Sequence, residues 1–263
     1  MTKISLYFTH KHVESAVELK DKNVVVIDVL RTSTTMSIGL ANGAKEIIPT
    51  EDVATAGLIG RNSQGQALLC GERNGKVIEG FNLGNSVKEY SVERVSGKTL
   101  IFNSTNGTPT IMKSKFAKMC VILGFANMTR VAEYLGELND DFIILCAGKT
   151  GEFSLEDTVC GGMLIYKLIK KNSKDNYTLT DSARGALRLY SAYKSDLFKM
   201  LSDSEHGRFL ASIGFKEDLL ECAKVDVCNS LPLLRNGIIK LRETFDSDPK
   251  LTMKKVAQKS PNS

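Results

Sequence analysis

The chain is poor in residues on which several classes of enzyme and binding protein depend. Its 263 residues include no Trp and only three His, which argues against a zinc enzyme and against an aromatic platform for stacked bases. No apolar run approaches the roughly 18 residues of a membrane span. The N-terminal stretch MTKISLYFTHKH is too short in apolar length for a signal peptide. We therefore expect a soluble, cytoplasmic protein.

The six Cys contain no C-x-x-C pair, and none is followed by Arg six positions later, so the loop of the cysteine phosphatases is absent. Several lie in apolar runs such as MCVIL and IILCAG. This pattern is typical of reduced, buried thiols in a cytosolic protein.

Basic charge is concentrated at the C-terminal end. The net charge is +5, but residues 250–263 carry four Lys and no acid, which leaves the rest near +1. A nucleic-acid-binding domain would need a basic face, and we expect none. With 42% hydrophobic and 25% charged residues, the composition is that of a globular protein. We predict one α/β domain over 1–245, with subdomains 1–97 and 98–245, and a flexible basic tail over 246–263.

Apolar runs and helical patterns alternate along the chain. Short apolar runs predict strands at 4–8, 24–29, 45–49, 67–70, 99–102, 119–123 and 142–146, with a last strand or extended crossing within 225–234. Helical patterns predict helices at 13–19 (weakly), 34–42, 52–59, 107–115, 127–135, 158–171, 181–201, 205–213 and 216–223. Ser154 and Asp157 have the spacing of a capping box.

This order predicts a three-layer α/β/α fold with a mostly parallel or mixed sheet and a helical C-terminal part. The passages 34–49 and 107–122 share one plan, a polar turn before a helix and a strand. Two explanations stay open: two related βαβ halves, or two units that obey the same packing rules.

Polar residues follow three of the predicted strands, in the segments 28–35, 103–108 and 146–157. If the strands are parallel, these junctions share the carboxyl edge of a sheet, where α/β proteins bind ligands. The irregular segment 71–90 follows a fourth strand and would close over that edge. The candidate bases are Arg31, Arg73 and Lys149, and the candidate acids are Asp28, Glu72, Glu156 and Asp157.

These charges together suggest phosphoryl chemistry. Arg suits the capture of tetrahedral anions, and clustered carboxylates suit a hard cation such as Mg²⁺. Other phosphate motifs are absent: AGKT at 147–150 has Ile143 where a P-loop needs Gly, and Leu30 stands where an aspartyl phosphatase has its second Asp. No G-x-S-x-G elbow occurs. His206, in SEHG, has the context of a surface or capping residue.

Five passages together form a recognisable set: VIDVLRTSTTM (26–36), GERNGKVIEGFNLGNS (71–86), STNGT (104–108), CAGKTGEFSLEDTVCGG (146–162) and SEHGRFL (204–210). In this order they resemble the 2-phosphosulfolactate phosphatase (ComB-like) family. The resemblance implies an α/β, Mg²⁺-dependent phosphatase, a phosphoric monoester hydrolase that converts (R)-2-phospho-3-sulfolactate to 3-sulfolactate and phosphate. In this family the step belongs to sulfolactate formation, including coenzyme M biosynthesis. Departures from the family pattern at Asn82, Val87 and Asn103 keep other substrates open.

The hypothesis assigns each candidate residue a role. Asp28, Arg31, Glu72 and Arg73 would be catalytic, and Asp28, Glu72, Glu156 and Asp157 would hold Mg²⁺. The substrate would contact Thr32, Ser33, Asn85, Ser86, Thr105, Asn106, Gly107 and Lys149. The expected partner is a small anionic phosphorylated and sulfonated substrate, with no nucleic acid and no membrane, and a homodimer is considered. Two alternatives remain: a phosphatase for another small phosphorylated carboxylic acid, or a non-catalytic anion-binding homologue.

Overall fold

A computed structural model describes residues 1–63 and 65–246. Within them eleven strands form one sheet in the order β5-β4-β6-β3-β11-β10-β7-β2-β8-β1-β9. This confirms the α/β class with a mixed sheet. The tail predicted for 246–263 lies, apart from its first residue, outside the described residues.

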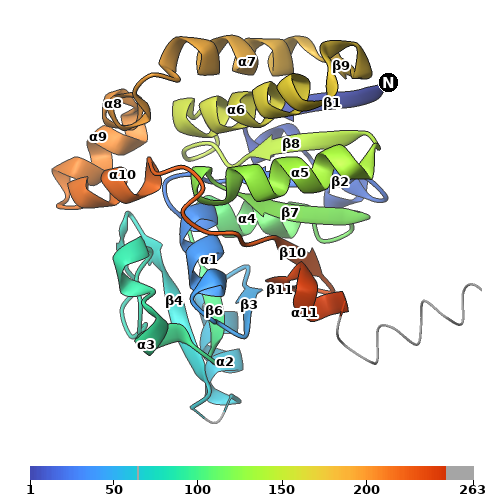
Figure 1. The fold of residues 1–263 in the computed structure, drawn as a ribbon. Helices are drawn as coiled ribbons and strands as arrows, with labels where there is room; N and C mark the ends of the chain where they lie inside the picture. The colour runs from blue at the N-terminus through green and yellow to red at the C-terminus, as the bar shows by residue number, and fades with distance from the viewer. Residues whose placement is uncertain (64, 247–263) are drawn as a thin grey trace, which may run out of the picture.

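The sheet consists of two parallel blocks joined by an antiparallel hairpin. The larger block contains β7 (Met119–Leu123), β2 (Asn23–Ile27), β8 (Phe142–Cys146), β1 (Thr2–Tyr7) and β9 (Tyr177–Leu179). The smaller contains β4 (Ala67–Arg73), β6 (Thr99–Asn103) and β3 (Glu46–Pro49), with β5 (Lys76–Val77) antiparallel at its edge. The hairpin of β10 (Pro232–Arg235) and β11 (Ile238–Leu241) connects β7 to β3. In Figure 1 the larger block runs across the picture, and β4 and β6 run down it.

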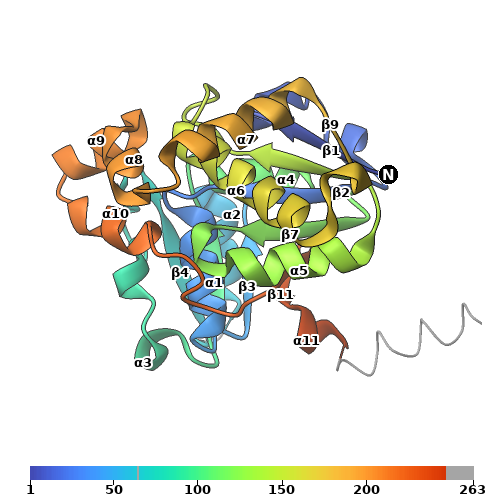
Figure 2. The same cartoon turned by 45° about the horizontal axis from the view of Figure 1, so that its top comes forward.

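Helices cover both faces of the larger block, as the apolar runs of its strands require. Along β2, Val25 and Ile27 face one apolar cluster, and Val24 and Val26 face the other, because successive side chains of a strand point to opposite faces. One cluster includes α5 (Met128–Leu138), α6 (Leu155–Asn172) and α7 (Asp181–Tyr193), which Figure 2 shows side by side. The other includes α1 (Thr32–Ala41) and α4 (Gly107–Lys113). The three-layer prediction is confirmed.

Within the described ranges, six further helices have nine residues or fewer. They are α2 (Val53–Arg61), α3 (Val92–Val95), α8 (Leu197–Asp203), α9 (Glu205–Ser212), α10 (Lys216–Cys222) and α11 (Arg242–Asp246). In Figure 1 α8, α9 and α10 gather at one end of the molecule, next to the turn that leads into α1. Among the described residues no helix is long and apolar enough to cross a membrane.

Strand predictions were accurate for the central strands of the larger block, but they missed both edge strands and one strand of the hairpin between the blocks. Strands 119–123 and 142–146 are confirmed to the residue. The helix predicted over 13–19 is wrong: two 3-10 turns, His10–His12 and Ala16–Leu19, lie there. The helix predicted over 181–201 is two helices, because Asp196 caps a new one by accepting from the backbone N–H of Lys199. Strands β5, β9 and β11 were not predicted.

The sheet crosses the boundary expected between 97 and 98, since β6 pairs with β3 and β4 from earlier in the chain. The division into subdomains stays a prediction.

Candidate active site

A cavity of about 210 Å³ lies where the ends of both parallel blocks meet. The turns after β2, β6 and β8, the segment after β4, and α9 contribute its walls. Eight residues singled out from the sequence line it: Asp28, Arg31, Thr32, Glu72, Asn85, Thr105, Asn106 and Lys149. Six others lie among the described residues but are not part of the lining: Ser33, Arg73, Ser86, Gly107, Glu156 and Asp157.

The expectation of one shared carboxyl edge is therefore only partly right. β2 and β8 are parallel neighbours, but three successive antiparallel pairings separate β6 from them. The two blocks nevertheless meet, because the Thr32 hydroxyl after β2 donates to the Ser104 hydroxyl after β6 at 3.1 Å. The site lies at the junction of two blocks rather than along one edge.

Asp28 lies against the start of α4 at this junction. A Cβ atom on Gly107 would lie 2.5 Å from Asp28 Oδ2 and 2.4 Å from Thr32 Oγ1. Both distances are below any normal contact, so the approach of the two segments requires Gly at 107. Gly107 therefore serves the site through its small size, not as a lining residue.

Burial shapes the chemistry of Asp28, which is 5% exposed. Loss of water around the carboxylate raises the pKa of Asp28 to about 6, and the charges of Glu72 and Glu156 act in the same direction. A hydrogen bond from Thr32 and the proximity of His206 oppose this rise. The site thus holds a carboxyl group that changes charge near neutral pH.

Glu72 forms the adjoining wall. One of its oxygens accepts from the backbone N–H of Thr105 at 2.7 Å, and the other accepts from the backbone N–H of Gly75 at 2.8 Å. These bonds fix the turn after β4 against the start of α4. Each oxygen retains a second lone pair, so the carboxylate can still accept one more contact per oxygen.

Arg31 is held in a buried ion pair that the sequence did not predict. Its guanidinium donates to Asp218 Oδ2 and to the carbonyl of Gly75, both at 2.6 Å, and lies 4.3 Å from the centre of the Phe215 ring. The second oxygen of Asp218 accepts from the Ser86 hydroxyl at 2.6 Å. Arg31 and Ser86 thus attach α10 to the wall of the cavity. The sequence held a signal that Asp218 is buried, because Leu219 and Cys222 mark the apolar face of the same helix and Asp218 lies next to it.

Two more candidates have structural positions. Arg73 is exposed, and its guanidinium donates to the carbonyl of Glu72 and to the side chain of Asn103. The Ser33 hydroxyl accepts from the backbone N–H of Asp28 at 2.9 Å and shapes the turn. Neither residue lines the cavity, and the catalytic role expected for Arg73 and the substrate contact expected for Ser33 stay predictions.

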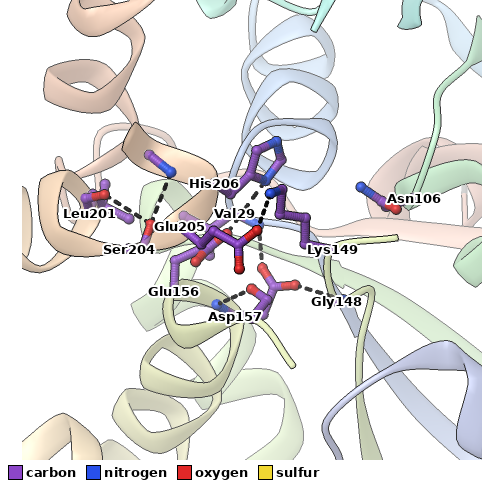
Figure 3. Close-up of polar contacts among 12 residues, drawn as sticks. Val29, Asn106, Gly148, Lys149, Glu156, Asp157, Leu201, Ser204, Glu205 and His206 are labelled. Carbon is purple, nitrogen blue, oxygen red and sulfur yellow. Dashed lines mark hydrogen bonds and ion pairs between the residues drawn. The ribbon is translucent and has the colours of Figure 1, made fainter. Parts of the chain in front are cut away.

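The capping box expected at α6 is half present. Ser154 Oγ accepts from the backbone N–H of Asp157 at 3.3 Å. The Asp157 carboxylate does not return the bond. It accepts instead from the backbone N–H groups of Val29 at 2.8 Å and Gly148 at 3.1 Å (Figure 3). Burial, and then the charges of Glu156 and Asp28, raise the pKa of Asp157 well above its usual value. Asp157 therefore ties the ends of β2 and β8 together.

Lys149 and His206 also line the cavity. The Lys149 amine pairs with Glu205 and lies 5.7 Å from the centre of the Phe209 ring. His206 lines the cavity, its side chain is 14% exposed, and its Nδ1 lies 3.4 Å from Glu156 Oε1 (Figure 3). The interpretation of His206 as a surface residue was wrong, because α9 turns it inward.

Known proteins resemble this chain over most of its length. A family model described as 2-phosphosulpholactate phosphatase matches residues 7–237. A curated relative from Caldanaerobacter subterraneus subsp. tengcongensis is 38% identical over 229 residues, covering 87% of this chain and 94% of the relative. The chain belongs to the 2-phosphosulpholactate phosphatase family. This confirms the resemblance stated from the sequence.

Two further members of the family cover similar lengths. A relative from Thermotoga maritima is 37% identical over 222 residues, with 84% of this chain and 93% of the relative covered. One from Caldicellulosiruptor saccharolyticus is 37% identical over 243 residues, with 90% and 99% covered. All three relatives are named probable 2-phosphosulfolactate phosphatase. The family is named for a phosphoric monoester hydrolase, which confirms the expected enzyme class.

The four acids expected to hold Mg²⁺ do not form one ligand set in this family member. Among the described residues no group of three or more His, Cys, Asp or Glu side chains is arranged to hold a metal ion. Glu156 faces His206, and Asp157 is bound to backbone N–H groups. Asp28 and Glu72 remain as acids that line the cavity.

The cavity nevertheless has the oxygen donors that suit a hard cation. Thr105 Oγ1 and Asn85 Oδ1 are buried and have no hydrogen-bond partner among the described residues. Buried polar atoms without partners indicate a site for a ligand. Mg²⁺ is typically bound by one or two carboxylates together with water and substrate phosphate. Asp28 and Glu72 therefore fit a magnesium ion that a bound phosphate would help to hold.

Proposed function

We propose that this protein hydrolyses 2-phospho-3-sulfolactate to 3-sulfolactate and phosphate with the help of Mg²⁺. The single observation that carries the proposal is the small cavity that Asp28, Glu72, Lys149 and His206 line together. A phosphate ester of this kind carries several negative charges, so two carboxylates in the same cavity would repel it. A cation between them removes the conflict, and Asp28 and Glu72 would hold it.

The protein's own groups then have distinct tasks. Lys149, which lines the same cavity as Asp28, supplies positive charge to the anionic substrate. Thr105 Oγ1 and Asn85 Oδ1, which are buried and have no hydrogen-bond partner among the described residues, orient the substrate or the water around it. Arg31 contributes indirectly, since it fixes α10 through Asp218. When bound, Mg²⁺ would neutralise phosphate charge and lower the pKa of a bound water.

Release of inorganic phosphate tests the proposal. The wild-type protein is assayed with 2-phospho-3-sulfolactate in Mg²⁺ and again with excess EDTA, and Asp28→Asn is assayed in Mg²⁺. We expect turnover only for the wild-type protein with Mg²⁺. Turnover that persists in EDTA would refute the role of Mg²⁺, and full activity of the variant would refute the role of Asp28.

Two other functions remain to be separated from this one. A panel of small phosphorylated carboxylic acids distinguishes a different substrate, because the true substrate will have the highest kcat/KM. An anion-binding protein would bind the ester without releasing phosphate, and EDTA would not change its affinity. The presence of Asp28 and Glu72 in the cavity argues against a role in anion binding alone, because carboxylates repel anions.

We further propose that the protein works in the cytoplasm. All six Cys are free thiols and five are buried, as is usual for proteins of a reducing compartment. The homodimer stays a prediction, which sedimentation velocity of the purified protein will test.

A further inference from the structure

One buried acid beside the cavity has no role in the function proposed above. Glu156 lies in the first turn of α6, and its side chain is 2% exposed. An ionised carboxylate in such a position needs a partner, because burial without one is costly. The partner in the structure is His206, whose Nδ1 lies 3.4 Å from Glu156 Oε1.

The environment of His206 fixes the orientation of its ring. It is in the first turn of α9, which begins where Ser204 Oγ accepts from the backbone N–H of Gly207 at 3.0 Å. The ring stacks on Phe209 with 6.3 Å between centroids. Glu156 holds the Nδ1 edge (Figure 3). Nε2 is thus the ring nitrogen left for the cavity, and it has no hydrogen-bond partner among the described residues.

The charged groups around this ring come from four parts of the chain. Glu156 contacts it from α6, and Asp28 at the end of β2 interacts with it electrostatically. Glu205 precedes it in α9 and is paired with Lys149 of the turn after β8. The ring therefore lies between a buried orienting carboxylate and the groups expected to contact the substrate.

We propose that His206 is the general acid that protonates the leaving oxygen of the phosphate ester, and that Glu156 is the positioning residue that orients it. A histidine with a carboxylate beside one ring nitrogen and the other nitrogen free is a common arrangement for proton transfer. The inference rests on the proposed phosphatase function and adds a residue to it. Sulfolactate leaves through an alkyl oxygen, which is a poor leaving group unless it receives a proton.

Cleavage of the ester bond is coupled to transfer of one proton from His206. The bond between phosphorus and the ester oxygen breaks, and its electron pair stays on that oxygen. The oxygen takes the proton from His206 Nε2, which leaves a neutral imidazole whose protonated Nδ1 faces Glu156. Phosphorus gains a bond to an oxygen that comes from water in the overall reaction, and a proton from that water restores Nε2–H.

A comparison of leaving groups tests this role. An aryl ester such as p-nitrophenyl phosphate leaves without protonation, whereas an alkyl ester such as 2-phospholactate needs it. For His206→Asn we expect kcat with the alkyl ester to fall by about 10²–10⁴-fold, the usual contribution of a general acid. With the aryl ester we expect a fall of at most about tenfold. Glu156→Gln should show the same selectivity with a smaller fall.

The matched control is His12→Asn, the same change at an exposed histidine near the N-terminus, which should leave both rates unchanged. Circular dichroism checks that each variant is folded, and His206→Gln replaces His206→Asn if the latter is not. Equal falls with both esters would overturn the inference, because a structural or binding role affects both alike. That result would leave wild-type phosphate release intact, so it is distinct from failure of the proposed function, in which the wild-type protein releases no phosphate.

Discussion

The buried carboxyl of Asp28 predicts an unusual relation between stability and pH. Its pKa is raised from 3.8 to about 6, mainly by burial, so the folded protein holds this proton over a pH range in which the unfolded chain has lost it. Stability therefore falls as pH rises from about 4 to 6, by about 1 kcal/mol for each pH unit. The full loss is about 3 kcal/mol, of which about 2 kcal/mol falls between pH 4.5 and 7.5.

Asp28→Asn removes this titration and keeps the shape of the side chain. We expect the free energy of unfolding of the variant, relative to the wild-type protein, to rise by about 2 kcal/mol between pH 4.5 and 7.5. Loss of the Asp28 charge also relieves Asp157, whose pKa that charge raises, and this acts in the same direction. At pH 7.5 the variant should be more stable than the wild-type protein and inactive. The proposed reaction requires the negative charge of Asp28, and burial of that charge destabilises the fold.

Urea unfolding measured in EDTA at several pH values checks this prediction, because a bound cation would neutralise Asp28. Lost or unsatisfied hydrogen bonds of the new amide shift all values by a constant, so the slope with pH is the informative quantity. Asp203→Asn, at an exposed aspartate, is the control for the substitution itself. A difference between Asp28→Asn and the wild-type protein that is constant over this pH range would refute the reasoning.

Three other predictions concern packing and exposure. Gly107→Ala should abolish phosphate release and lower the free energy of unfolding in urea by about 1–3 kcal/mol, because the new Cβ would lie 2.5 Å from a carboxylate oxygen of the site. Its control is Gly185→Ala, where a Cβ would meet nothing within 4 Å, and this change should stabilise α7 by about 0.5–1 kcal/mol. Asp218→Ala should lower the free energy of unfolding by about 3–5 kcal/mol, because it leaves the buried guanidinium of Arg31 without its partner. Glu217→Ala on the same helix removes only an exposed ion pair and should leave the unfolding midpoint unchanged. Ellman's reagent should modify Cys228 in the native protein and the five buried thiols only after denaturation, and rapid reaction of all six in the native protein would contradict this.

Local patterns were sufficient to predict the central elements of the fold. The apolar runs that became β7 and β8 have the same bounds in the structure as in the sequence, because a strand buried on both faces must be apolar throughout. The polar residues after β2 were likewise correctly placed beside a cavity. These features depend on neighbours in the chain, which a sequence shows directly.

Pairs far apart in the chain were not predictable in this way. Arg31 was expected to bind an anion, but its partner Asp218 is 187 residues away. The sequence around His206 was typical of a surface residue, but in the structure α9 places its side chain beside Glu156. Asp157 matched the capping box in spacing, yet its carboxylate binds the end of β2. In each case the residue type was noticed and its partner was not.

The sequence by itself determined the class of fold, the family and the chemical character of the site. Asp28, Glu72 and Lys149 were identified because acids and bases follow buried strands, and an α/β sheet brings such junctions to its ends. Only the tertiary structure decided which of these side chains face the cavity and which stabilise its walls. Hydrogen-bond partners depend on how the two strand blocks meet and on where α9 and α10 pack, and no local pattern encodes those positions.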